Sequence, residues 1–166
     1  MIDFKNLKTR EEGSILIESI VAINVTLVGL LGVLSLLSNS LALNRDVGEK
    51  FIATYLAAEG IEIVRNLTDA NFVQGNSWNA GINDGEHAVS YDSESLLPSS
   101  ENYLSFKDGL YGYDAAGAPT IFKRSVGIEN VSAQEITVVS TVFWSTKRGV
   151  QEVKLEDHFF NWRKPL

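Results

Sequence analysis

The apolar residues of this chain are concentrated near its N-terminus. The run over 14–37, SILIESIVAINVTLVGLLGVLSLL, has Glu18 as its one ionisable residue. As a helix, a run of this length crosses a hydrocarbon layer of about 30 Å. The pattern therefore predicts a membrane-spanning helix over 14–43, preceded by a short polar segment over 1–13.

The next segment, 44–67, alternates apolar and charged residues at helical spacing. Its apolar positions include Val47, Phe51, Tyr55 and Ala58, and then Leu56, Ile63 and Leu67. This pattern predicts an amphipathic continuation, so that 14–67 forms one helix of about 80 Å. The helix should end near 68–71, where the sequence becomes rich in Asn and Gly.

Three glycines lie inside the predicted helix, Gly29, Gly32 and Gly60. Each costs about 1 kcal/mol relative to alanine in a helix interior. We therefore expect a bend or local melting at these positions.

Short alternating segments follow the helix and predict strands over 87–91, 103–107, 120–128, 135–145 and 150–160. The last two are joined by a short turn ending in Gly149, which predicts an antiparallel hairpin. One face of this hairpin carries Ile136, Val138, Val142 and Trp144, with Val153, Leu155 and Phe159 on the second strand. We expect this face to pack against the helix around 51–67. The predicted fold is α+β: a long N-terminal helix with a small antiparallel sheet on its second half, and a head over 44–166.

Composition and charge exclude several classes of function. The net charge is −7, with an isoelectric point of about 4.8, which argues against nucleic-acid binding because that requires a basic face. Cysteine is absent, which excludes disulfides and thiolate nucleophiles. With two histidines, His87 and His158, and no catalytic constellation, the sequence predicts neither an enzyme nor a cofactor.

A conventional secretory signal is an alternative interpretation of the N-terminus. Small residues over 38–42 would allow a cut after Ala42 that discards the apolar run. The run is long for a signal, however, and continues into the amphipathic segment without a Pro or Gly-rich break. These features favour a helix that is retained.

The border between the polar and apolar segments carries the most informative pattern. It reads Gly13-Ser14-Ile15-Leu16-Ile17-Glu18. A carboxylate in a membrane helix costs about 2.5 to 3.5 kcal/mol at mid-bilayer, so its retention indicates a use. Cleavage after Gly13 would free an α-amine on Ser14. In a bundle of staggered copies, that amine would neutralise Glu18 of a neighbour and fix the axial register.

These residues resemble the processing site of type IV prepilins and pseudopilins. The resemblance implies that 1–13 is a leader peptide, cut after Gly13 by a prepilin peptidase on the cytoplasmic side. It further implies N-methylation of Ser14, an assembly role for Glu18 and a pilin-like fold. The protein would be a single-pass membrane protein with a cytoplasmic N-terminus, which then joins other pilin subunits in an extracytoplasmic filament.

Two further features bear on the type of subunit. The stretch 56–66, LAAEGIEIVRN, is similar to that of minor pilins of the pilus-assembly V type and of their type II secretion counterparts. Ser35 stands where many major pilins have a helix-kinking Pro. The resemblance therefore favours a minor subunit of a type IV pilus or a type II secretion system. The alternative is a membrane-anchored extracytoplasmic binding domain that never polymerises.

Other polar and aromatic residues have competing interpretations. Asn83, Asp84, Glu86, Asp92 and Glu94 offer the oxygen ligands that calcium prefers, at a spacing that matches no known ligand loop. The alternative is a solvated loop, and no metal site is predicted. Asn24 and Thr26 are either hydrogen-bonding contacts between helices or tolerated polarity. Trp78, Trp144 and Trp162 are candidate binding aromatics, although the alternating strand pattern places Trp144 in the core.

Overall fold

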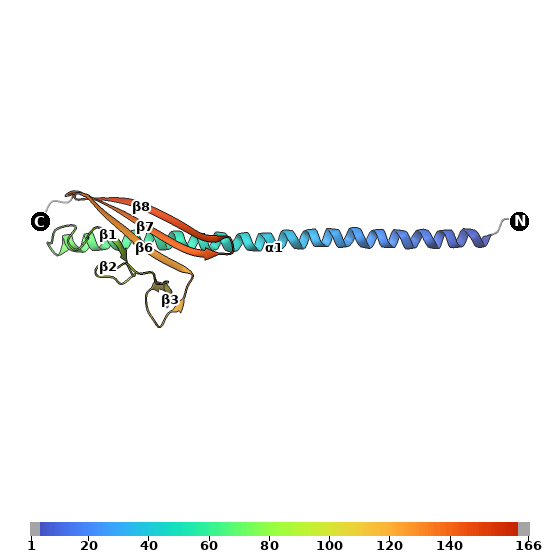
Figure 1. The fold of residues 1–166 in the computed structure, drawn as a ribbon, viewed down its shortest axis with the longest axis horizontal. Helices are drawn as coiled ribbons and strands as arrows, with labels where there is room; N and C mark the ends of the chain where they lie inside the picture. Colours follow the sequence, from blue (N-terminus) through green and yellow to red (C-terminus); the bar gives the residue numbers. More distant parts are fainter. Residues whose placement is uncertain (1–3, 163–166) are drawn as a thin grey trace. The chain divides into compact units, whose positions relative to one another are not determined.

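The computed structural model describes the backbone of 4–162 and the side chains of 14–162. The predicted leader and its cleavage residue Gly13 lie outside the residues whose side chains are described. The elements are a helix and eight strands (Figure 1): α1 Phe4–Val73, β1 Gly85–Ala88, β2 Leu97–Pro98, β3 Ser105–Lys107, β4 Leu110–Gly112, β5 Ala118–Pro119, β6 Phe122–Ser132, β7 Glu135–Thr146 and β8 Gly149–Phe160. The chain divides into two units, Met1–Asp46 and Val47–Leu166, and the second is called the head below.

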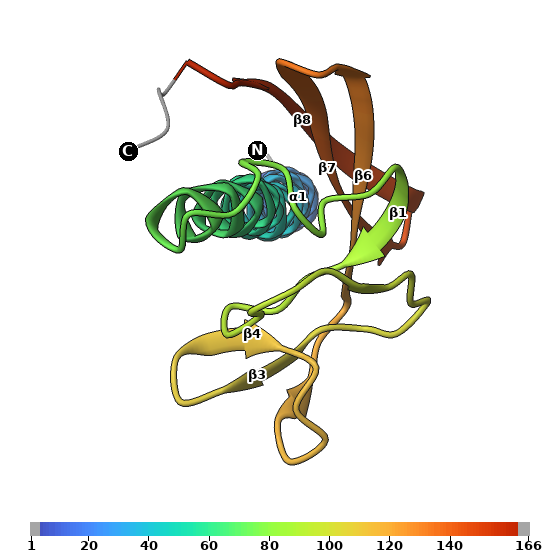
Figure 2. The ribbon, with the colours of Figure 1, turned by 90° about the vertical axis from the view of Figure 1, so that its left-hand side faces the viewer.

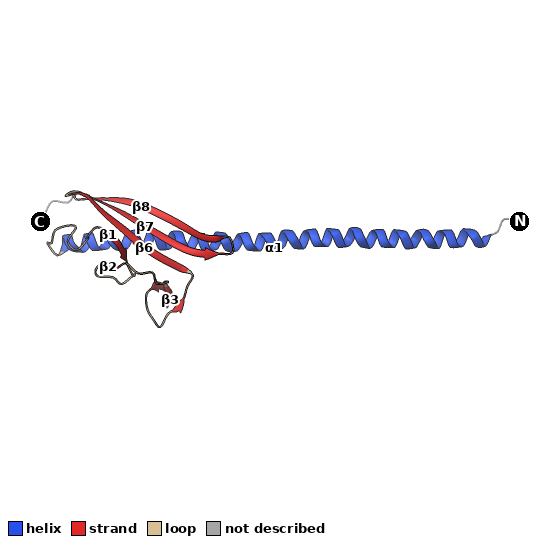
Figure 3. Cartoon of the chain, in the orientation of Figure 1, coloured by secondary structure: helices blue, strands red, loops and turns tan. Residues whose placement is uncertain are grey.

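Helix α1 is longer than predicted at both ends. It begins at Phe4 rather than at 14 and ends at Val73, and it runs unbroken through its glycines (Figure 3). Its end is a glycine cap: Gly75 has a φ of +73°, and Asn76 N donates to Asn71 O at 2.9 Å. The Asn71 side chain also donates to Ala80 O at 2.8 Å, which ties the following loop back to the last turn.

The strands form two antiparallel sheets, one in the order β2-β1-β6-β7-β8 and one in the order β4-β3-β5. All five predicted strand segments overlap observed strands, whereas the short strands β2, β4 and β5 were not predicted. The predicted hairpin is confirmed: β7 pairs with β8 along its whole length, and Thr146 faces Gly149 across a two-residue loop. Gly149 has a φ of +114°, a conformation that favours glycine over other residues.

In the head, strands β6, β7 and β8 pack on one side of the second part of α1, with β3 and β4 lying beyond β1 (Figure 2). The predicted inward face of β7 is confirmed, because its four apolar residues are all buried: Ile136, Val138, Val142 and Trp144. On β8, Phe159 is buried, while Val153 and Leu155 are half-buried as expected for an edge strand. The coarse prediction of a long helix packed on an antiparallel sheet therefore holds.

The helix face that meets the sheet is the predicted one only in part: Leu56 and Ile63 are buried and Leu67 is half-buried, as predicted, whereas the other four predicted positions are exposed. Val47, Phe51, Tyr55 and Ala58 are exposed, and the buried positions are Ala53, Leu56, Ala57, Gly60, Ile61, Ile63 and Val64. The contact at the centre is close: a Cβ added to Gly60 would lie 2.4 Å from Ser140 Oγ of β7. The sheet therefore packs against a face that combines aliphatic side chains with Ala57 and Gly60, and the aromatic side chains of Phe51 and Tyr55 lie outside it. Gly60 is a packing residue and not a weak point of the helix.

A buried arginine that was not predicted from the sequence joins helix α1 to strand β6 and to the segment just after β1. The side chain of Arg124 on β6 is 0% exposed, and its Nη1 donates to Leu56 O at 3.1 Å and to the Glu59 carboxylate at 2.9 Å. Its Nη2 donates to Val89 O, just after β1, at 2.6 Å. A buried charge is tolerated only when it is paired in this way.

Candidate functional site

The N-terminal unit contains a helix segment suited to a membrane. Among the described residues, the part of α1 that begins at Ser14 is the one helix long and apolar enough to cross a bilayer, by length and composition. None of its most apolar window is buried within the chain. Large apolar side chains such as Ile17, Leu31 and Leu36 are exposed all round it. Apolar surface of this extent requires lipid or other helices to cover it.

Three polar side chains within this segment bond to carbonyls of their own helix. Ser19 Oγ donates to Ile15 O at 2.8 Å, Asn24 Nδ2 donates to Ile20 O at 2.7 Å, and Thr26 Oγ1 donates to Ala22 O at 2.8 Å. These bonds to the carbonyl four residues earlier reduce the cost of a hydroxyl or amide in lipid. Asn24 and Thr26 are therefore not left in need of a partner helix.

Glu18 differs from these neighbours. Its carboxylate forms no hydrogen bond or ion pair with any other described residue. It lies four positions after Ser14, and in a helix residues at this spacing share one face about one turn apart. The structure thus places the predicted first mature residue and the predicted assembly residue on the same helix face, and no described residue neutralises the charge.

Two side chains of the candidate calcium loop form hydrogen bonds with strand β6. Asp84 accepts hydrogen bonds from Asn130 N at 2.6 Å and from Asn130 Nδ2 at 2.8 Å, and these bonds hold the pKa of Asp84 below its ordinary value. The Glu86 carboxylate is bonded by Ser125 Oγ. Within 14–162 no three His, Cys, Asp or Glu side chains gather closely enough to hold a metal ion. Asp84 and Glu86 instead attach β1 and its preceding loop to β6.

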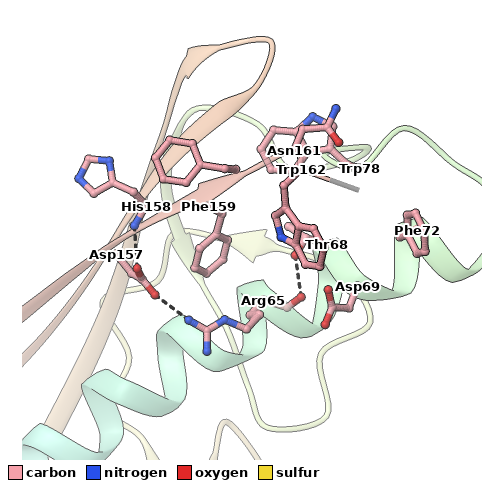
Figure 4. A pocket seen from close by; sticks show the side chains of 11 residues that line it. Arg65, Thr68, Asp69, Phe72, Trp78, Asp157, His158, Phe159, Asn161 and Trp162 are labelled. Carbon is pink, nitrogen blue, oxygen red and sulfur yellow. Dashed lines mark hydrogen bonds and ion pairs between the residues drawn. The ribbon is translucent and has the colours of Figure 1, made fainter. Parts of the chain in front are cut away.

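One of the three tryptophans lies in the core, and the other two line a cavity. Trp144 is in the core, as predicted. Trp78 is half-buried, and its Nε1 donates to Ala133 O at 3.2 Å, whereas Trp162 is 76% exposed. Both Trp78 and Trp162 line a cavity of about 340 Å³ in the head (Figure 4). The other walls of this cavity come from α1 and β8 and were not predicted from the sequence. The tryptophans were the one sequence signal for the cavity.

No family model, no curated protein and no solved structure matches this chain, so its function is inferred from its own residues.

Proposed function

We propose that this chain is a structural subunit of a pilin-like filament, a minor pilin or pseudopilin of a type IV pilus or a type II secretion system. The observation that carries the proposal is Glu18. Among the described residues it is a lone carboxylate without a partner, one turn from Ser14, in a part of α1 whose large apolar side chains, from Ile15 to Leu43, are all exposed. Such a helix is complete only inside a bilayer or among other helices.

The proposed pathway has two stages. A prepilin peptidase removes the leader after Gly13 at the cytoplasmic side, and the new amine of Ser14 is N-methylated. The helix meanwhile anchors the chain in the membrane, with the head on the extracytoplasmic side. In the second stage the subunit leaves the lipid and its helix packs among those of other pilin subunits.

The charge pair gives this second stage its geometry. A lone carboxylate in an apolar surrounding costs about 2.5 to 3.5 kcal/mol at mid-bilayer, and so does a lone ammonium. Placing the Ser14 amine of one subunit beside Glu18 of the next would neutralise both. A stagger that is wrong by one turn would leave both unpaired, so the pair would favour one axial register over the others.

The test compares Glu18→Ala with Ser19→Ala. Ser19 is the adjacent polar residue, and its hydroxyl is bonded to its own helix, so its loss should leave assembly unchanged. Both substitutions make the segment more apolar, which excludes a loss of membrane anchoring as the cause of any defect. We expect Glu18→Ala to reach the membrane in normal amounts but to be depleted in sheared filaments. Equal incorporation of the two variants would contradict a register-setting role, as would neutralisation of Glu18 by the amine of its own chain.

Processing provides a separate test. Mass spectrometry of the protein from cells that contain a prepilin peptidase should show a mature chain that begins at Ser14, and Gly13→Leu should block this cut. An intact Met1 terminus, or a cut after Ala42, would refute the proposal.

The second candidate is a membrane-anchored binding domain that does not polymerise, and the cavity in the head favours it. It predicts a retained leader together with the absence of the protein from filaments. The N-terminal mass and the filament fraction therefore separate the two candidates.

A further inference from the structure

The cavity in the head lies where the last turns of α1 face the end of β8. Figure 4 shows Arg65 and Asp69 on the helix, Asp157 on the strand, and Trp162 directed toward the helix. Its volume of about 340 Å³ lies within the range of small-molecule sites, which is about 300 to 1,000 Å³. Neither membrane anchoring nor the charge pair at the N-terminus uses any of these residues.

Two tryptophans give the cavity flat apolar walls. Trp78 is held in place by its bond to Ala133 O, so its ring is fixed before any ligand arrives. Trp162 is 76% exposed, so most of its surface is accessible to a ligand. Indole faces of this kind stack on flat ligands that have an apolar face.

The polar groups of the cavity supply both donors and acceptors. Arg65 donates to Glu62 at 3.0 Å and to Asp157 at 2.7 Å, which uses two of its five N–H groups and holds the guanidinium in place. Thr68 donates to Arg65 O at 2.7 Å, so its oxygen is left as an acceptor. The Asn161 side-chain amide lines the same cavity and offers both a hydrogen-bond donor and an acceptor. A ligand with several hydroxyl groups, each able to donate and accept, matches this set.

The charges argue against an ionic ligand. The guanidinium of Arg65 already lies over the Phe159 ring, at 5.3 Å from the centroid, and is paired with Glu62 and Asp157, so an anion would have to compete with two carboxylates for it. A cation would have to displace Arg65 from Asp157, and Asp69 also has an interaction of its own. A neutral ligand avoids both costs.

We propose that this cavity binds a neutral saccharide unit. One face of a pyranose ring stacks on the indole of Trp162, and its hydroxyl groups bond to Arg65, Thr68 and Asn161. The cavity thus gives the head a recognition function that is independent of filament assembly.

The experiment uses the full chain in phosphatidylglycerol nanodiscs, which contain neither glycosidic detergent nor choline headgroups. Tryptophan fluorescence is titrated with glucose, galactose, mannose, N-acetylglucosamine and their β1,4-linked disaccharides, and with choline chloride as the cationic probe. We expect saturable binding of at least one saccharide and none of choline. Saturation-transfer NMR should show contact through the pyranose ring protons.

Variants separate the cavity from the rest of the head. Trp162→Ala, at an exposed position, should keep the head folded and weaken saccharide binding by about tenfold, with Trp78 as the remaining reporter. Tyr103→Ala removes an exposed aromatic side chain outside the cavity lining and should leave binding unchanged. Glu18→Ala should also bind normally, so that failure of the saccharide proposal is distinguishable from failure of the filament proposal. Absence of binding by every saccharide, unchanged affinity in Trp162→Ala, or binding of choline in preference to saccharides would overturn the inference.

Discussion

The glycines of α1 show how differently the two units use the same residue type. A Cβ added to Gly29 or Gly32 would meet nothing within 4 Å, whereas one added to Gly60 would collide with Ser140. The glutamates differ in the same way, because Glu59 is paired with buried Arg124, whereas Glu18 has no partner among the described residues. The head thus has its core and its buried charge pair within one chain. The apolar side chains of the N-terminal unit are exposed, and no described residue neutralises its Glu18.

The largest effect on the head should come from Arg124→Met. The substitution removes the partner of Glu59 and leaves two backbone carbonyls, those of Leu56 and Val89, without their donor. Loss of one member of a buried ion pair costs about 3 to 5 kcal/mol, and we expect the lower end because Glu59 is partly exposed. Urea unfolding of the full chain in micelles, followed by the fluorescence of the core residue Trp144, measures this loss. A change below about 1 kcal/mol would show that the pair does not hold the helix on the sheet.

Gly60→Ala should have the next largest effect, a destabilisation of about 1 to 2 kcal/mol. Overpacking against Ser140 and Arg124 outweighs the gain in helix propensity. Gly48→Ala is the matched control, since it lies in the same helix with nothing within 4 Å of the added Cβ and should stabilise slightly. The double variant Gly60→Ala/Ser140→Gly should recover part of the loss in the same unfolding assay. If Gly60→Ala matches Gly48→Ala, the close approach is not limiting.

A smaller effect should appear in the pH dependence of the head. The hydrogen bond with Glu135 raises the pKa of His158 above its ordinary value of 6.5, with a further contribution from Glu156. A raised pKa in the folded state stabilises the head below pH 6.5, and this contribution is lost as the pH rises through the folded value. The midpoint of urea unfolding should therefore fall as the pH increases above 6.5. In His158→Gln this part of the dependence should vanish.

The smallest effect should be that of Gly29→Ala on the same unfolding transition. Nothing within the chain contacts this position, so the head should unfold within about 0.5 kcal/mol of the wild type. A larger change would mean that the N-terminal unit contributes to the packing of the head, and the contrast between the two units would fail.

The sequence predicted those elements whose periodicity is long and regular. The apolar run and the β7–β8 hairpin, with Gly149 at its turn, follow from local patterns alone. The buried face of the helix followed only in part: Leu56 and Ile63 were predicted, but hydrophobicity also pointed to Phe51 and Tyr55, whereas close approach of the sheet selected Ala57 and Gly60. The strands that were not predicted, β2, β4 and β5, carry too few residues to show a period.

The candidate site could be predicted in part for a similar reason. Glu18 is conspicuous in the sequence because one charge in an apolar run is locally anomalous. Arg124 gave no such signal, since its burial depends on Glu59 and on a backbone carbonyl brought near by the fold. The cavity joins Arg65 to Asp157 across 92 positions, and only tertiary contacts of this kind reveal it.

The contact between Arg124 and Leu56 also sets an order of events during synthesis. These residues are 68 positions apart, and β7 and β8, which complete the core, are made later still. Until the ribosome has passed residue 160, the helix has no sheet to cover its apolar face, and contacts of such long range form slowly. The nascent chain is therefore exposed to aggregation for most of its translation.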